Sequence, residues 1–278
     1  MSATDLRSTS RNLRRRGYSL NRIVAITGRP KTSVYFHIRD VKLPADVKRR
    51  IAERSTLRLI KFNRSRKGKS ARGRHPNEFT SWNADLVCLV SHFLFDGEIR
   101  YGGCVYTNRS TTLLNRVERL MRSVYDHPPK RIEASPGVYR ISYHNVELAA
   151  YLRGRAKELL QRIPTAPREW QRAFLSSFFD DEGSVYFIGT KRRVRGYQHS
   201  FEMLTLIHEL LQKFRIESTL DRKYNEVTIS RRENIERFAR EINFSPGVRI
   251  NGQRSNSIWK RSLEKRKILR RAIASYQR

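Results

Sequence analysis

Cysteine is scarce in this sequence, and long apolar runs are absent. The two cysteines, Cys88 and Cys104, belong to no C-x-x-C pair and have no zinc-ligand spacing to the seven histidines. A disulfide framework and a structural zinc site are therefore not expected. No apolar run approaches the roughly 20 residues of a membrane-spanning helix, and the N-terminal "MSATDLRSTSRNLRRRG" lacks the apolar core of a secretory signal. These absences favour a soluble intracellular protein that is not secreted.

Acidic residues are scarce relative to basic ones. The 278 residues include 58 Lys and Arg but only 26 Asp and Glu, which gives a formal net charge of +32. A chain with this charge repels itself unless a polyanion neutralises it, so nucleic acid is the expected partner and an anionic membrane surface is the rival. The 38% of hydrophobic residues suffice for one or two domains with a core. No G-x-x-x-x-G-K-[ST] loop is present, which argues against an ATP-driven enzyme.

The basic charge is concentrated near the N-terminus. Residues 1–78 contain 22 Lys and Arg against 5 Asp and Glu, and within residues 48–74 only Glu53 opposes 12 basic residues. Residues 63–74, "NRSRKGKSARGR", are rich in Ser, Gly and Arg and predict extended chain. We therefore expect residues 46–78 to form a basic linker that can follow phosphates.

Residues 1–45 predict a small all-α domain of three short helices. Gly17 ends the first helix, Ser19 can cap the second, and Pro30 opens the third. The apolar face of this domain consists of Leu20, Ile23, Val24, Val34 and Ile38. About residues 4–42 resemble the helix-turn-helix of resolvases and transposases. The resemblance implies that the third helix enters the major groove of DNA and presents Lys31, Thr32, Ser33, Tyr35 and Arg39.

The rest of the chain contains an internal repeat. The stretch "FLSSFFDDEGSVYF" has a counterpart in "DLVCLVSHFLFDGEIRYGG", and 86 residues (182 − 96) separate the equivalent acids Asp96 and Glu182. We therefore expect two copies of an α/β unit, over residues 79–160 and 161–278. Each copy begins with an amphipathic helix, and Gly97 and Gly183 can end these helices in the left-handed conformation. If the two helices pack side by side, Asp96 and Glu182 converge.

A carboxylate at the C-terminus of a helix is unfavourable, because the helix dipole places partial negative charge there. A divalent cation resolves this conflict. Two carboxylates, backbone oxygens at Gly97 and Gly183, and DNA phosphates form an oxygen-rich site suited to Mg²⁺, with Mn²⁺ as a substitute. Such a site supports hydrolysis of phosphodiesters.

The two motifs resemble those of the LAGLIDADG homing endonucleases in their single-chain form. "LSSFFDDEG" matches the family's nine-residue motif in its Leu, its sixth-position Asp, the acid at its eighth position and its final Gly. "LVSHFLFDG" matches in Leu, the eighth-position Asp and Gly. The first motif departs from the family at Leu94, where an acid is usual, and at His92, which we interpret as an ordinary packed or solvated side chain. The resemblance covers about residues 80–260.

This resemblance implies an α+β fold: two pseudo-symmetric αββαββα halves forming a saddle, with strands along the DNA major groove. By carry-over, Asp96 and Glu182 are the catalytic, metal-binding acids. The family also places a basic residue near each metal, and the candidates are Lys223, Arg231, Lys130 and Arg140. A C-terminal basic helix is expected to pack against the second half.

The expected function is site-specific cleavage of double-stranded DNA by a monomer. Because the two halves differ in sequence, the target is expected to be long and either asymmetric or pseudo-palindromic. The side chains expected to contact DNA from the strands are Arg100, Tyr101, Tyr106, Arg109, Tyr186, Lys191, Arg192, Arg193 and Arg195. Two alternatives stay open: a transcription regulator that binds DNA without cleaving it, and an RNA maturase.

Overall fold

In this computed structural model, residues 3–66, 75–77, 81–250 and 261–276 are described, and they fall into two compact units, residues 1–73 and 74–278. Each unit is considered by itself. No helix among the described residues is both long and apolar enough to cross a membrane.

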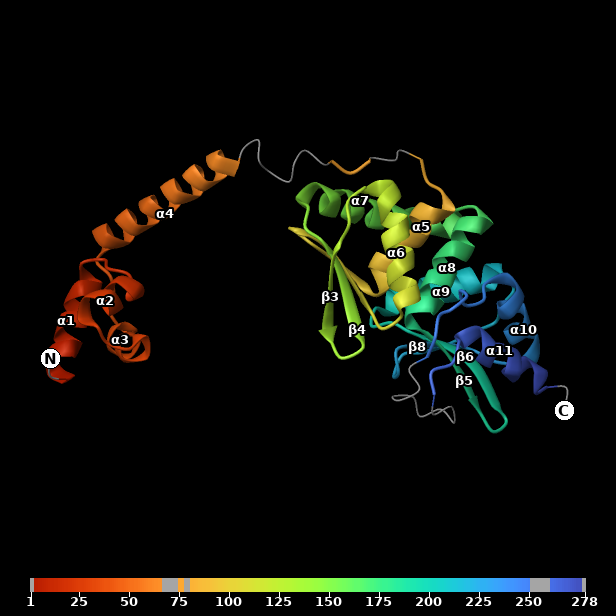
Figure 1. Ribbon diagram of the computed structural model, residues 1–278. Helices are drawn as coiled ribbons and strands as arrows, with labels where there is room; N and C mark the ends of the chain where they lie inside the picture. The colour runs from red at the N-terminus through yellow and green to blue at the C-terminus, as the bar shows by residue number, and fades with distance from the viewer. Residues whose placement is uncertain (1–2, 67–74, 78–80, 251–260, 277–278) are drawn as a thin grey trace. The chain divides into compact units, whose positions relative to one another are not determined.

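The N-terminal unit contains the three expected short helices. They are α1 (Ala3–Arg15), α2 (Leu20–Thr27) and α3 (Lys31–Ile38) (Figure 1). Gly17 follows α1 with a φ of 90°, and the Ser19 hydroxyl accepts a hydrogen bond from the backbone N–H of Arg22, which starts α2. Ile23, Val34 and Ile38 form the small core. The apolar spacing of the sequence therefore predicts this core correctly.

A fourth helix, α4 (Ala45–Arg66), occupies much of the segment that was expected to be a linker. The prediction of extended chain from Asn63 onward is wrong for residues 63–66. Ala45–Arg66 contains no Gly or Pro, and Asp46 pairs with Arg50 one turn later, so the stretch favours a helix over extended chain. Residues 67–74 lie outside the described part of the chain.

The C-terminal unit begins with the first αββαββα half. Its sheet is antiparallel in the order β1-β2-β4-β3. The elements are α5 (Ala84–Phe95), β1 (Gly97–Arg100), β2 (Gly103–Asn108), α6 (Thr111–Val124), β3 (Lys130–Ser135), β4 (Val138–Tyr143) and α7 (Val146–Arg162).

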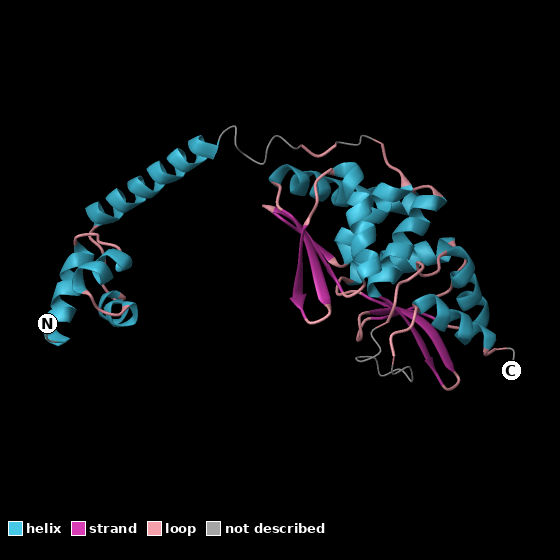
Figure 2. Ribbon diagram, in the orientation of Figure 1, coloured by secondary structure: helices cyan, strands magenta, loops and turns pink. Residues whose placement is uncertain are grey.

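The second half repeats this order after the short 3-10 helix η2 (Ile163–Thr165). Its sheet has the equivalent order β5-β6-β8-β7. The elements are α8 (Arg168–Glu182), β5 (Gly183–Ile188), β6 (Lys191–Tyr197), α9 (Phe201–Lys213), β7 (Thr219–Asp221), β8 (Glu226–Ile229) and α10 (Arg232–Glu241), followed by α11 (Lys265–Ala274). The α+β fold with two αββαββα halves is thus confirmed (Figure 2).

Helices α5 and α8 pack against each other at the centre of this unit and join the cores of its two halves. Phe95 at the end of α5 contacts Phe174 and Phe178 of α8, with ring centroids 5.2 Å apart in each case. Because both helices bury apolar side chains on several faces, neither half can lose the other without exposing this core to water.

Gly97 and Gly183 act differently from the expectation. Gly183 is extended, with φ −89° and ψ 155°, and neither glycine has a positive φ, so the left-handed conformation is wrong for both. Each strand instead starts so close to the preceding helix that a side chain has no room. A Cβ on Gly97 would lie 2.5 Å from Phe93 Cα, and a Cβ on Gly183 would lie 2.4 Å from the Phe179 carbonyl oxygen. Glycine is therefore needed for close approach.

The two sheets each have one face toward the helices and one face away from them, which we call the outer strand face. Cys104, Tyr106 and Ile141 are buried on the helix side of the first sheet, as Val185 and Val194 are in the second. Strand alternation and register place the opposite set on the outer strand face: Glu98, Arg100, Thr107, Lys130 and Arg140 in the first sheet, and Tyr186, Lys191, Arg193 and Arg195 in the second.

Candidate active site

The structure brings Asp96 and Glu182 together where α5 and α8 end. Asp96 directly follows α5, and Glu182 is the last residue of α8. Burial raises the pKa of Asp96 to about 7, with a further contribution from the charge of Asp181. Burial also raises the pKa of Glu182 to about 8, and the charges of Asp96 and Asp181 add to this effect. The two carboxyl groups are thus close enough to repel each other.

Asn108, at the end of β2, orients the Asp96 carboxylate. Its Nδ2 donates a hydrogen bond to Asp96 Oδ2 over 2.5 Å, and its Oδ1 accepts one from the backbone N–H of Ser110 over 2.8 Å. The amide is therefore held at both ends, which fixes the position of the acid. The sequence did not identify Asn108, because nothing in the motif indicates that the end of β2 lies beside the acid that follows α5.

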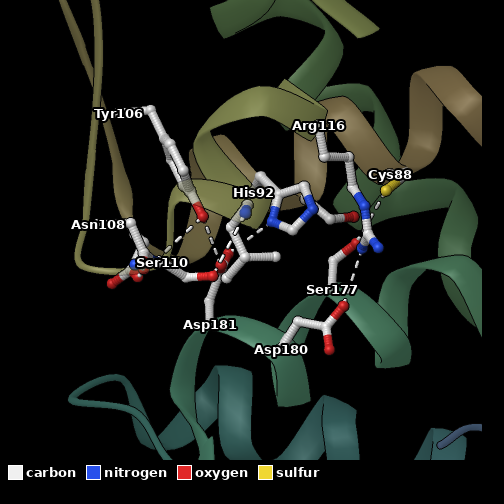
Figure 3. A network of polar contacts seen from close by, with 12 residues as sticks. Cys88, His92, Tyr106, Asn108, Ser110, Arg116, Ser177, Asp180 and Asp181 are labelled. Atoms are coloured by element: carbon white, nitrogen blue, oxygen red, sulfur yellow. Dashed lines mark hydrogen bonds and ion pairs between the residues drawn. The ribbon is translucent and has the colours of Figure 1, made fainter. Parts of the chain in front are cut away.

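A buried network formed by Asp181, His92 and Tyr106 lies beside the two acids (Figure 3). One Asp181 oxygen is 2.8 Å from His92 Nδ1, and the other accepts a hydrogen bond from the Tyr106 hydroxyl over 2.6 Å. The side chains of His92 and Asp181 are fully buried. His92 is packed as expected, but its partner across the helix interface was not predicted.

Tyr106 was expected to contact DNA, and this expectation is wrong. The residue is fully buried, because its position in β2 points its ring toward the helices rather than toward the outer strand face. Its role is to donate to Asp181.

Asp180, the sixth residue of the second motif, has a structural role. Its Oδ2 pairs with Arg116 over 2.9 Å, and its Oδ1 accepts a hydrogen bond from the backbone N–H of Ser245 over 2.8 Å. The carboxylate thus joins α8 to α6 and to the segment that follows α10.

Lys265, the first residue of α11, is the basic side chain that reaches the acids. Its ammonium group donates to the carbonyl oxygens of Phe179 and Asp180, over 3.1 and 2.7 Å, and the residue is only 5% exposed. Burial lowers the pKa of Lys265, while the nearby carboxylates of Asp180, Asp181, Asp96 and Glu182 act in the opposite direction. The positive charge therefore lies against the C-terminal end of α8, where the helix dipole is negative.

The four basic residues proposed from the sequence lie elsewhere and contact neither acid. Lys130 is exposed on β3, and the ammonium of Lys223 lies over the Tyr224 ring. Arg140 donates to the Thr107 hydroxyl, and Arg231 pairs with Glu217. The sequence does contain a signal for Lys265, because this lysine shares helical spacing with the buried Ile268, Leu269 and Ala272.

The site fits a hard divalent cation in its donor chemistry. Asp96 and Glu182 are partly exposed, and neither forms an ion pair with a basic side chain in the described part of the chain. The described residues contain no group of three or more His, Cys, Asp and Glu arranged to hold a metal ion. Two partly exposed carboxylates suit Mg²⁺, which keeps several waters and accepts phosphate oxygens as its other ligands.

The residues expected to contact DNA lie at α3 in the N-terminal unit and on the strands and loops of the C-terminal unit. On α3, Lys31, Thr32 and Tyr35 are exposed and Ser33 is half-buried, and Arg39, which directly follows the helix, is also exposed. In the C-terminal unit, Arg100, Tyr101 and Arg109 are exposed, and Tyr186, Lys191, Arg193 and Arg195 lie on the outer strand face.

Arg192 faces the helix side, opposite to the prediction. Its Nε donates to the Ser275 hydroxyl over 2.6 Å, and its guanidinium lies 4.5 Å from the centre of the Tyr276 ring. Arg192 therefore anchors the end of α11 to β6 and does not belong to the outer strand face. Strand alternation requires this, because Arg192 lies between Lys191 and Arg193.

A cleft of about 560 Å³ is lined by Asn108, which binds Asp96, and by Asp181, which precedes Glu182. Asp180, Asp181 and Lys265 line it from the second half, together with Arg249, and Arg109 lines it from the first. Each half thus contributes one arginine to the lining of this cleft.

The two αββαββα halves define a LAGLIDADG-like fold. A family model described as a LAGLIDADG-like domain matches residues 169–243, which run from α8 into the turn after α10. No curated protein matches the sequence.

Solved structures to which this chain is similar include mesophilic variants of the homing endonuclease I-DmoI, at 19% identity and a TM-score of 0.45, covering 58% of this chain and 95% of that one. A complex of I-DmoI with DNA and Mn has the same identity and TM-score and covers 59% and 99%. Full-length DUF199/WhiA from Thermatoga maritima matches at 15% identity and a TM-score of 0.47, covering 72% of this chain and 62% of that one.

Proposed function

We propose that this protein binds double-stranded DNA and cleaves it at a specific site with the help of a divalent cation. The observation that carries this proposal is the pair Asp96 and Glu182, two carboxylates that converge at the ends of α5 and α8 and form no ion pair with a basic side chain of the described residues. Two carboxylates that repel each other are unfavourable for the fold, and a bound divalent cation would offset this repulsion. A metal-binding role therefore explains the pair better than a structural role does.

Within this proposal, Asp96 and Glu182 hold the cation, with backbone oxygens of Gly97 and Gly183 beside them. Asn108 keeps Asp96 in one orientation. Lys265 offsets part of the acidic charge from within the protein, so that the acids stay together before DNA arrives. When bound, Mg²⁺ or Mn²⁺ supplies Lewis-acid stabilisation of the charge that develops on the attacked phosphodiester.

DNA contact is assigned to the outer strand face and to α3. Arg100, Lys191, Arg193 and Arg195 supply positive charge along the strands, and Arg109 extends it to the cleft. Phosphate contacts of this kind set affinity and position, while side chains that reach base edges set sequence preference. Because the two halves carry different side chains on this face, one monomer is expected to recognise a long asymmetric or pseudo-palindromic site.

One observation favours a second candidate, a DNA-binding regulator that does not cleave. Lys265 places a positive charge inside the acidic centre, so the fold can balance much of this charge without a metal. A domain that binds DNA without cleaving it needs only this internal neutralisation by Lys265 and no bound metal.

The deciding experiment incubates the protein with a library of randomised DNA sites in Mg²⁺, and in EDTA as a control. Cuts at one defined sequence in Mg²⁺, absent in EDTA, are expected for the endonuclease. Selective retention of one sequence without cuts in Mg²⁺ or Mn²⁺ would reject the endonuclease in favour of the regulator.

Adjacent arginines on β6 allow a matched test of the DNA-binding face. Arg193→Ala is expected to weaken DNA binding for all sequences and to lower the slope of log affinity against log salt by about one unit, because one phosphate contact is lost. Arg192→Ala is expected to lower thermal stability instead, since Arg192 holds Ser275, and to leave the salt slope unchanged. Fluorescence anisotropy at four salt concentrations measures both, and equal slopes for the two variants would place DNA elsewhere.

A further inference from the structure

Cys88 and His92 lie one turn apart on α5 and face the same buried space as Asp181 (Figure 3). Asp181 engages Nδ1 of the imidazole over 2.8 Å. The other ring nitrogen, Nε2, is fully buried and has no hydrogen-bond partner among the residues that the structure describes. It lies on the side of the ring toward Cys88, whose charge acts on His92 together with that of Asp181 (Figure 3). Cysteine, imidazole and carboxylate thus follow one another in a line.

The surroundings of the Cys88 sulfur favour its negative form. The Ser177 hydroxyl on the facing helix shares its one proton between the Cys88 sulfur, 3.4 Å away, and the Ala173 carbonyl oxygen, 2.9 Å away, and the charge of Arg116 also acts on the sulfur. Burial by itself would raise the pKa of the Cys88 thiol, but the positive charge of His92, together with Ser177 and Arg116, holds it below its ordinary value. Burial likewise opposes protonation of His92, but Asp181 and Cys88 raise the imidazole pKa well above its usual range.

We propose that Cys88 is a modification site: a thiolate paired with the His92 imidazolium that hydrogen peroxide oxidises to sulfenic acid. The site is independent of DNA cleavage and of any metal. The Cys88 proton moves to His92 Nε2, and the thiolate sulfur then attacks one oxygen of the peroxide. As the S–O bond forms, the O–O bond breaks, and the departing hydroxide takes the proton from Nε2 to become water. The sulfur loses two electrons and the peroxide gains them.

The chain contains its own control for this chemistry. Cys88 is partly exposed, whereas Cys104 is fully buried, and burial raises the pKa of its thiol to about 12. Burial accounts for this rise in the pKa of Cys104, and neither an imidazole nor a carboxylate contributes to it. A thiol in that environment is inert, while a thiolate beside an imidazolium is the reactive type.

The consequence of oxidation follows from the position of the sulfur between helices. An oxygen atom added to Cys88 enters the interface between α5 and Ser177 of α8, and protein interiors tolerate added volume poorly. Oxidised protein is therefore expected to unfold at a temperature several degrees lower than reduced protein.

The test uses the full-length protein with hydrogen peroxide and a 1,3-dione that traps sulfenic acid, followed by mass spectrometry of each cysteine peptide. Cys88 is expected to be labelled at least about tenfold faster than Cys104. His92→Gln is expected to slow labelling of Cys88 by at least about tenfold, and Ser177→Ala is expected to slow it less.

Circular dichroism checks that each variant is folded. If His92→Gln fails to fold, Ser177→Ala decides, because it removes a donor to sulfur and leaves the His92 and Asp181 pair intact. Equal labelling of Cys88 and Cys104 in the wild type would overturn the proposal. Unchanged labelling of Cys88 in the folded variants would do the same.

Discussion

Asp96→Asn and Glu182→Gln are each expected to lower the rate of DNA cleavage in Mg²⁺ by at least about 100-fold. Loss of a residue that only supports a metal ligand costs 10–100-fold in activity or metal affinity, so loss of a ligand itself is expected to cost more. Each substitution keeps the size of the side chain and removes its charge. Because the two carboxylates repel each other, removing one is also expected to leave the fold as stable as before or more stable.

The measurement is a single-turnover cleavage assay on the sequence selected from the library, with affinity for the same DNA measured in parallel. Glu169→Gln is the matched control, because Glu169 is an exposed acid on the same helix as Glu182, at its opposite end. It is expected to cleave at the wild-type rate. Cleavage that survives in Asp96→Asn or Glu182→Gln would remove that acid from the active site, and loss of DNA binding alongside cleavage would make its role structural.

The repeated Gly-ended motif predicts the fold well, for a physical reason. Glycine is required where each strand starts against its helix, and an acid precedes it in both halves, so two equivalent helix-to-strand junctions are recognisable. The apolar spacing of α5 and α8 further indicates that both helices are packed. Both features involve residues that are close together in the sequence, so they can be recognised without knowing how distant segments pack.

The contents of the site are harder to predict, because they depend on which distant segments meet. Lys265 follows Glu182 by 83 residues (265 − 182) and reaches the end of α8 only because α11 packs back onto β5. Tyr106 and Arg192 were assigned to the wrong face, since alternation in a strand separates two faces without saying which one is buried. The partnership of His92 and Asp181 had a usable signal: each is a polar residue on an otherwise apolar helix face.

Lys265→Met is expected to lower the free energy of unfolding by about 3–5 kcal/mol in EDTA. Methionine fills a similar volume, but it removes the ammonium group from two α8 carbonyl oxygens, of which that of Phe179 keeps the backbone N–H of Gly183 as a donor. It also leaves four nearby carboxylates without their internal cation. Removing one member of a buried charged group has a cost of this size because the remaining charge stays buried. Lys267→Met is the matched control, since Lys267 is largely exposed on the same helix and is expected to change stability by less than about 0.5 kcal/mol.

Two rescues separate loss of charge from loss of packing. If Lys265 acts as the counter-ion of the acids, adding Glu182→Gln to Lys265→Met is expected to recover on the order of 1 kcal/mol, because the excess negative charge falls. Mg²⁺ is also expected to raise the unfolding temperature of Lys265→Met more than that of the wild type, since a divalent cation can take over part of the neutralisation. Chemical denaturation and thermal unfolding with and without Mg²⁺ measure these effects. Additive losses in the double variant, with no larger Mg²⁺ effect, would show that Lys265 serves only to hold α11 against α8.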